Sequence, residues 1–110
     1  MSARISTRAR DDLDHIFAYL SVTYGEPAAD DFLDQAKQSI AFLVQNPEAG
    51  PHPKWLRRQK ELRFWVISRT NYLIYYLPDE MGVSIERVLD GRRDVKRIVQ
   101  HRREEPGSAE

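Results

Sequence analysis

The chain has 110 residues, of which 41% are hydrophobic and 31% charged, and it contains no cysteine. This length fits one domain that can bury a core without cross-links, and the lack of cysteine excludes disulfides and cysteine-ligated metal sites. The formal net charge is zero, but residues 1–50 hold 4 Lys or Arg against 8 Asp or Glu, a net −4, whereas residues 51–103 hold 13 against 6, a net +7. A basic C-terminal half favours an acidic partner, protein or nucleic acid, although such residues can also be merely solvated.

The sequence also bears on the compartment in which the protein works. No N-terminal apolar segment resembles a signal peptide, and no apolar run approaches the length that spans a bilayer. We therefore expect a cytoplasmic protein.

The first 25 residues predict one short strand and one long helix. Met1–Ser6 alternates apolar and polar residues, which suits an edge strand. Apolar residues recur at helical spacing through Thr7–Tyr24, which predicts a helix. Ser6 or Thr7 would be its N-cap, and Gly25 lies just past its last turn.

A second helix is predicted directly afterwards. Pro27 suits the first position of a helix, and apolar residues recur at helical spacing from Ala29 to Val44. Asn46 precedes Pro47 and ends the helix, because the residue before a proline avoids the α region. The short link at Tyr24–Pro27 requires the two helices to form an antiparallel hairpin.

Three β-rich runs follow the proline-rich, basic connector at 47–60. They are Leu62–Ile67, Tyr72–Leu77 and Val83–Leu89, separated by short polar turns. Short links make neighbouring strands antiparallel, so the runs predict a three-stranded meander. In the last run, alternation places Val83, Ile85 and Leu89 on one face, with Ser84 and Glu86 on the other.

The predicted fold is therefore α+β, a small antiparallel sheet in the order β-α-α-β-β-β packed against the helical hairpin. Asp94 would cap a short C-terminal helix over Val95–His101. We expect one domain over residues 1–101 and a disordered charged tail over residues 102–110.

No catalytic signature is present in the sequence. The three histidines are scattered, so no metal site is expected, and no cofactor is indicated. Arg63 and Arg87 lie inside predicted strands, where they could hold a phosphodiester. Alternatively, they pair with acids across the strands, and Arg92 and Arg93 simply fix the corner through Asp90 and Asp94.

The ordered set of short motifs resembles the ParE branch of the ParE/RelE toxin superfamily of bacterial toxin–antitoxin systems. The matching positions cover about residues 3–99 and include Tyr24-Gly25, Gly50, Arg63, the run Tyr72-Leu73-Ile74-Tyr75-Tyr76, and Arg87-Val88-Leu89-Asp90-Gly91-Arg92-Arg93-Asp94. The resemblance implies a toxin that is neutralised by a co-encoded ParD-like antitoxin. It also implies that DNA gyrase is the target and that the protein is a binding protein and not a hydrolase.

Two alternatives stay open within this resemblance. RelE-like relatives cleave mRNA on the ribosome, in which case Arg63 and Arg87 would hold phosphate. The other alternative is an inactive homologue that only binds its antitoxin. Many relatives have histidine where this chain has Asp90, and the segment Asp94–Arg103 has no tyrosine and only His101 to move a proton.

Two binding surfaces follow from the resemblance and the charge pattern. We expect the gyrase-binding surface to be basic and to contain Arg87, Arg92, Arg93, Lys96 and Arg97. We expect the antitoxin to lay a helix against apolar residues of the hairpin, namely Leu13, Phe17, Leu20, Phe32, Ala36 and Ile40.

Overall fold

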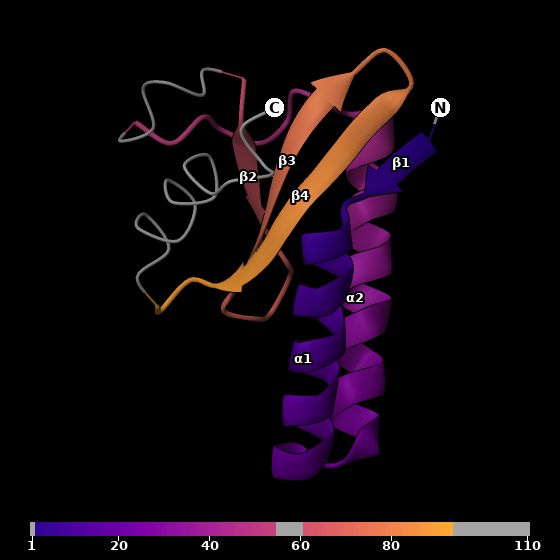
Figure 1. The fold of residues 1–110 in the computed structure, drawn as a ribbon, viewed down its shortest axis with the longest axis vertical. Helices are drawn as coiled ribbons and strands as arrows, with labels where there is room; N and C mark the ends of the chain where they lie inside the picture. Colours follow the sequence, from indigo (N-terminus) through magenta and orange to yellow (C-terminus); the bar gives the residue numbers. More distant parts are fainter. Residues whose placement is uncertain (1, 55–60, 94–110) are drawn as a thin grey trace.

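The computed structural model describes residues 2–54 and 61–93, which contain two helices and four strands. The elements are β1 (Ser2–Ile5), α1 (Thr7–Tyr24), α2 (Glu26–Gln45), β2 (Arg63–Val66), β3 (Tyr72–Asp79) and β4 (Gly82–Asp90). Figure 1 shows the α1–α2 hairpin beside the sheet and continuing well beyond one end of it. The predicted α+β architecture is confirmed. The predicted terminal helix, Lys96, Arg97 and the tail at 102–110 lie outside the described residues, so the domain boundary at residue 101 stays a prediction.

The helical hairpin forms as its end signals predict. The Ser6 hydroxyl accepts a hydrogen bond from the Ala9 amide at 3.0 Å and so caps α1. Gly25 separates the two helices with φ of 98°, a conformation that favours glycine, and its amide donates to the Ser21 carbonyl. Pro27 lies in the first turn of α2, where its missing N–H leaves no helical bond unmade.

The sheet is mixed, whereas the sequence predicted an antiparallel one. Its strand order is β1-β4-β3-β2, and the β2–β3–β4 meander is antiparallel as predicted. The edge strand β1 instead pairs parallel to β4, with Ser2 opposite Gly82. The rule that short links give antiparallel neighbours says nothing about two strands that are far apart in the chain. A Cβ at Gly82 would clash with the backbone oxygen of Ser2, so this pairing requires glycine there.

A β-bulge divides β4 and overturns one prediction about its faces. Tyr75 pairs with Arg87 but Tyr76 pairs with Ile85, which leaves Glu86 as the extra residue. One inserted residue reverses the alternation beyond it. Val88 therefore joins the core under the helices, and the prediction that Leu89 faces the same way as Val83 and Ile85 is wrong.

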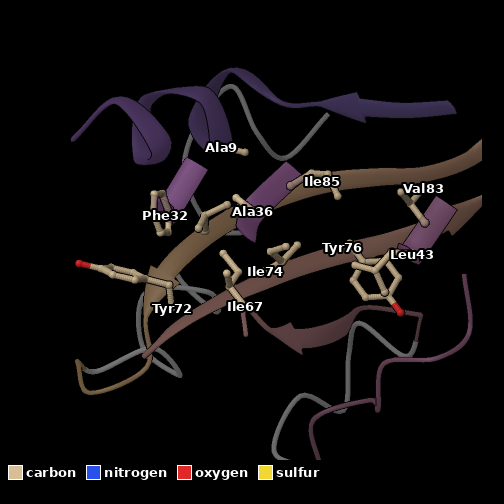
Figure 2. Packing of buried hydrophobic residues seen from close by; sticks show 11 residues of the cluster. Ala9, Phe32, Ala36, Leu43, Ile67, Tyr72, Ile74, Tyr76, Val83 and Ile85 are labelled. Atoms are coloured by element: carbon tan, nitrogen blue, oxygen red, sulfur yellow. The ribbon is translucent and has the colours of Figure 1, made fainter. Parts of the chain in front are cut away.

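The main core lies between the hairpin and the sheet. Figure 2 shows α2 contributing Phe32, Ala36 and Leu43 to the same layer as inward-facing residues of β3 and β4. A second cluster of Leu62, Tyr75 and Leu89 belongs to the other face of the sheet. This second cluster explains why β3 reads as an unbroken apolar run, since side chains from both of its faces are buried.

Candidate functional site

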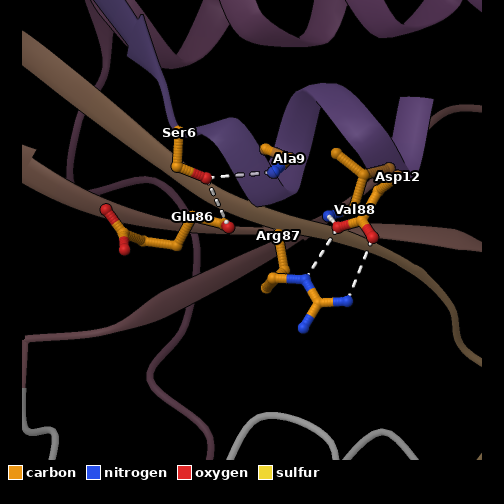
Figure 3. Close-up of polar contacts among 6 residues, drawn as sticks. All are labelled: Ser6, Ala9, Asp12, Glu86, Arg87 and Val88. Atoms are coloured by element: carbon orange, nitrogen blue, oxygen red, sulfur yellow. Dashed lines mark hydrogen bonds and ion pairs between the residues drawn. The ribbon is translucent and has the colours of Figure 1, made fainter. Parts of the chain in front are cut away.

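Arg87, one of the predicted site residues, is held by an acid on α1. The Arg87 Nε donates to Asp12 Oδ2 at 2.8 Å and its Nη2 donates to Oδ1 at 3.0 Å, while the Val88 amide donates to Oδ2 at 2.9 Å (Figure 3). The two charged side chains are only 15% and 12% exposed. Such a two-pronged pair fixes the guanidinium firmly, so Arg87 has a structural partner, and its burial leaves little of its remaining N–H surface for a phosphate.

Asp12 and Ser6 together close the part of the β4 edge that β1 does not cover. The β1 pairing ends at Ile5 opposite Ile85. Just beyond it, the Ser6 hydroxyl donates to the Glu86 carbonyl at 2.8 Å, and Asp12 then accepts from Val88 (Figure 3). The N-cap Ser6 and Asp12 of α1 thus supply side-chain partners where no strand is present, which hinders another chain from pairing with this edge.

Arg63, the second predicted phosphate ligand, fixes the loop after α2. Its Nη1 donates to the Gly50 carbonyl at 2.7 Å and to the Glu48 carbonyl at 3.1 Å. The Gly50 amide in turn donates to the Tyr76 hydroxyl at 2.9 Å, and a Cβ at Gly50 would clash with the Phe64 oxygen. Arg63 and Gly50 therefore join the connector to the sheet.

The structure does not bring Arg63 and Arg87 together. Arg63 pairs across the ladder with Tyr76, which packs in the core under the helices. Arg87 pairs with Tyr75, which belongs to the cluster on the other face. Directly opposed residues share a face, so the backbones present the two arginines on opposite faces of the sheet. Burial also raises the pKa of Tyr75 to about 12, far from the range useful for moving protons at neutral pH.

The Gly-Arg-Arg corner after β4 exposes two of the three residues of the predicted gyrase-binding surface that the structure describes. Asp90 accepts from the Arg92 Nε at 3.1 Å and Nη2 at 2.8 Å, and this hydrogen-bonded guanidinium holds the pKa of the Asp90 carboxyl below its ordinary value. The Gly91 amide donates to the Asn71 carbonyl at 2.7 Å, which anchors the corner to the β2–β3 turn. Arg92 and Arg93 are exposed, so both guanidinium groups are open to a partner.

The predicted antitoxin residues divide into two groups. Phe32 and Ala36 are each 3% exposed and belong to the core of the free chain. Leu13, Leu20 and Ile40 are partly buried against that core, and Phe17 is also partly exposed, which leaves part of each of these side chains for a partner. Periodicity identified the inward side of each helix without separating residues covered by the sheet from those at its margin.

Sequence reasoning missed a pocket at the end of the hairpin, which we call the hairpin-end pocket. Its volume is about 260 Å³, and its lining includes Tyr19, Tyr24, Asp31, Arg69, Tyr72 and Arg92. These residues come from α1, α2, the β2–β3 turn with the first residue of β3, and the corner, so no local motif marks them. The sequence shows only the types of these residues, because the exposure of the tyrosines and the positive φ of Arg69 appear only in the folded chain.

Two kinds of site were not found in the described residues. No group of three or more His, Asp or Glu side chains among residues 2–54 and 61–93 is placed to hold a metal ion. Neither α1 nor α2, the two helices of that part of the chain, has the length and apolar character needed to cross a membrane.

Comparisons with known proteins agree with this fold. The chain is similar to a solved structure described as the chromosomal ParDE TA system from P. aeruginosa, with a TM-score of 0.66 and 21% identity over 80% of this chain and 92% of that one. No curated protein is similar enough to count as a match. The model of the family "ParE toxin of type II toxin-antitoxin system, parDE" matches residues 3–95. Because this match runs from β1 past the corner after β4, the chain belongs to the ParE toxin family of type II toxin–antitoxin systems.

Proposed function

We propose that this toxin acts on DNA gyrase and that a co-encoded ParD-like antitoxin neutralises it. Family membership supports the gyrase target, and the observation that carries it in this chain is the exposed basic corner. Arg92 and Arg93 stand on a turn fixed by the Asp90 side chain and by the bond from Gly91 to Asn71. Exposed guanidinium groups suit an acidic protein patch or a DNA backbone, and the Arg92 guanidinium, already held by Asp90, loses little side-chain freedom on binding.

The contacts of Arg63 and Arg87 weigh against the alternative of an mRNA endonuclease. Each arginine already has carbonyl or carboxylate partners, and the register presents them on opposite faces of the sheet. Cleavage at a 2′-hydroxyl needs a group that can move a proton beside the phosphate ligands. The buried Tyr75, whose pKa is raised to about 12, does not supply one.

The antitoxin surface that we propose is the partly exposed margin of the hairpin. Leu13, Phe17, Leu20 and Ile40 offer apolar surface there, while Phe32 and Ala36 support it from within the core. An amphipathic helix laid along this margin would bury these side chains. The exposed arginines of the corner lie beyond it and favour acidic residues in the same partner.

A gyrase assay tests the proposal. We expect the purified full chain to inhibit supercoiling and to trap cleaved DNA when gyrase and ATP are present. Reversing Arg92, Arg93, Lys96 and Arg97 to glutamate should abolish inhibition. We expect thermal stability to stay nearly unchanged, since Arg92 and Arg93 are exposed and exposed charges contribute little to folding.

A purified translation system tests the alternatives in parallel. Codon-positioned mRNA cuts by the wild type would establish the endonuclease and overturn the gyrase target. A wild type that affects neither gyrase at micromolar excess nor mRNA, yet binds the antitoxin, would establish an inactive homologue.

A further inference from the structure

The hairpin-end pocket lies where the hairpin extends past the sheet. Figure 1 shows α1 and α2 continuing beyond the β2–β3 turn, so the helices and the end of the sheet meet at an angle. The pocket occupies this angle, and its lining combines Leu20 and Phe32 of the hairpin with Arg92 of the corner. It therefore joins the two surfaces that were proposed above for different partners.

One side of the pocket is aromatic and open to solvent. Tyr19 and Tyr24 are 51% and 68% exposed, and their rings meet edge to face with centroids 6.5 Å apart. Across from them, Tyr72 packs edge to face on Phe32 at 5.2 Å, and Figure 2 shows its hydroxyl pointing out of the core. Rigid tyrosines with one apolar and one polar end are a common feature of surfaces that bind proteins.

The other side of the pocket holds a cation in an unfavourable backbone conformation. Arg69 has φ of 63°, and it is the one positive-φ residue other than glycine in the described part of the chain. The turn around it is fixed, because the Thr70 hydroxyl donates to the Ile67 carbonyl at 2.8 Å and accepts from the Tyr72 amide at 3.0 Å. Glycine or asparagine would occupy this turn position with less strain, so backbone geometry does not explain the arginine.

Both cations of the pocket have donors to spare. Arg69 is exposed and makes no ion pair or side-chain hydrogen bond with any residue in 2–54 or 61–93. Arg92 gives only its Nε and Nη2 to Asp90, and its side chain is 64% exposed. A guanidinium group has five N–H donors, so each arginine has donors left for an incoming carboxylate.

The charge of the surrounding helix favours a peptide over a nucleic acid. Asp31 lines the pocket, and Asp30 and Asp34 are exposed on the same stretch of α2. These carboxylates oppose a phosphate backbone, with one charge on every nucleotide, more strongly than a peptide that brings few carboxylates. A peptide can place a carboxylate at the arginines and an apolar side chain among the tyrosines.

We propose that the hairpin-end pocket binds a segment of the antitoxin in which an acidic residue neighbours an aromatic or large aliphatic one. The antitoxin is the expected occupant because Leu20 and Phe32 make the pocket continuous with its proposed surface on the hairpin. This inference rests on the proposed function in requiring an antitoxin, but it does not require gyrase to be the target. Because Arg92 is shared with the proposed gyrase surface, an antitoxin in the pocket would also shield that surface.

Short peptides give the first test on the full chain. We expect the blocked peptide Asp-Leu-Phe-Glu to shift amide NMR signals of Arg69–Tyr72, Tyr24 and Arg92, and to bind more weakly as salt is raised. The peptide Lys-Leu-Phe-Lys and an oligothymidylate should not shift these signals. The proposal is overturned if the acidic peptide leaves these signals in place, or if the oligonucleotide shifts them instead.

The product of the adjacent gene gives the second test. Arg69→Gly removes the charge and keeps the turn, and losing a charged hydrogen bond should weaken antitoxin binding about tenfold. Lys54→Ala removes a positive charge from an exposed position of the connector, outside both the pocket and the hairpin, and should leave antitoxin binding unchanged.

Gyrase inhibition by the same variants separates the two proposals. We expect Arg69→Gly to inhibit gyrase as the wild type does. Unchanged antitoxin binding by Arg69→Gly, or a loss of gyrase inhibition without a loss of antitoxin binding, would overturn the pocket assignment. If the wild type does not inhibit gyrase at all, the target proposal fails while the antitoxin result still stands.

Discussion

The carboxylate of Asp12 binds the guanidinium of Arg87 across 75 positions of sequence, and it also accepts the amide hydrogen of the next residue in β4. It thereby fastens the first helix to the last strand. We expect Asp12→Ala to lower the free energy of unfolding by about 3 kcal/mol, because it leaves a poorly exposed guanidinium and a backbone amide without their acceptor. Urea unfolding measures this loss.

A matched variant separates the two roles of Asp12. Asp12→Asn keeps an oxygen for the Val88 amide but removes the charge, so its effect should fall between the wild type and Asp12→Ala. A loss below about 0.5 kcal/mol for Asp12→Ala, the usual size for ordinary surface positions, would show that the pair does not stabilise the fold.

The helices offer a second comparison, between two apolar residues of opposite exposure. Leu43 of α2 is 0% exposed, whereas Val22 of α1 is 88% exposed. Truncating Leu43 to alanine leaves a cavity against the sheet and should cost about 2–5 kcal/mol. Val22→Ala should cost nothing measurable and, since alanine is the better helix former, can even stabilise. Equal effects in thermal unfolding would contradict the packing described here.

The turn residue Arg69 should be replaceable with a gain in stability. Glycine takes positive φ without steric cost, so Arg69→Gly should raise the free energy of unfolding by up to about 1 kcal/mol. Ser68→Gly is the control: Ser68 does not have positive φ, so glycine there only increases the freedom of the unfolded chain and should destabilise. Both changes are read from denaturant midpoints, and a destabilised Arg69→Gly would mean that the arginine side chain supports the turn.

The raised pKa of Tyr75 predicts that the folded chain loses stability at alkaline pH. Burial raises its pKa from 10.0 to about 12, so between these pH values the unfolded chain releases a proton that the folded chain keeps. The unfolded state is therefore favoured increasingly as pH rises from 10 to 12, by about 1.4 kcal/mol per pH unit for one such group. Below pH 10 the group is protonated in both states and its contribution does not vary.

The phenylalanine variant isolates this effect. Tyr75→Phe should flatten the pH dependence of unfolding between pH 10 and 12, whereas Tyr24→Phe, at a 68% exposed position, should not. Tyr72 and Tyr76 also have raised pKa values because of burial, so some alkaline loss should remain. An unchanged profile for Tyr75→Phe would contradict the assignment to Tyr75.

The elements that sequence predicted well are those governed by local rules. Helix ends followed from Ser6 and Gly25, and the meander followed from β-rich runs separated by short turns. The bulge at Glu86 could not be predicted, because one extra residue in a strand leaves no mark in the pattern of apolar residues until the opposing strand is known. The parallel pairing of β1 with β4 could not be predicted either, because the two strands lie some eighty residues apart in the sequence.

The candidate site was less accessible to sequence than the fold. The arginines were found by their type, but the partners that define their roles, Asp12 for Arg87 and the carbonyls of Glu48 and Gly50 for Arg63, come from distant elements. The hairpin-end pocket is assembled from four separate segments, so only the folded chain reveals it.

The contacts of β4 with β1 and α1 determine when, during its synthesis, this toxin can complete its fold. Ser2, Ser6 and Asp12 each contact β4, at Gly82, Glu86 and Val88, so the N-terminal elements cannot dock on the sheet until that strand has left the ribosome. Long-range pairing of this kind also makes folding comparatively slow. A nascent chain that ends before Gly82 therefore keeps its hairpin unprotected and open to proteases. Interrupted translation should yield fragments without toxicity, and the basic corner is completed only after nearly the whole fold has been made.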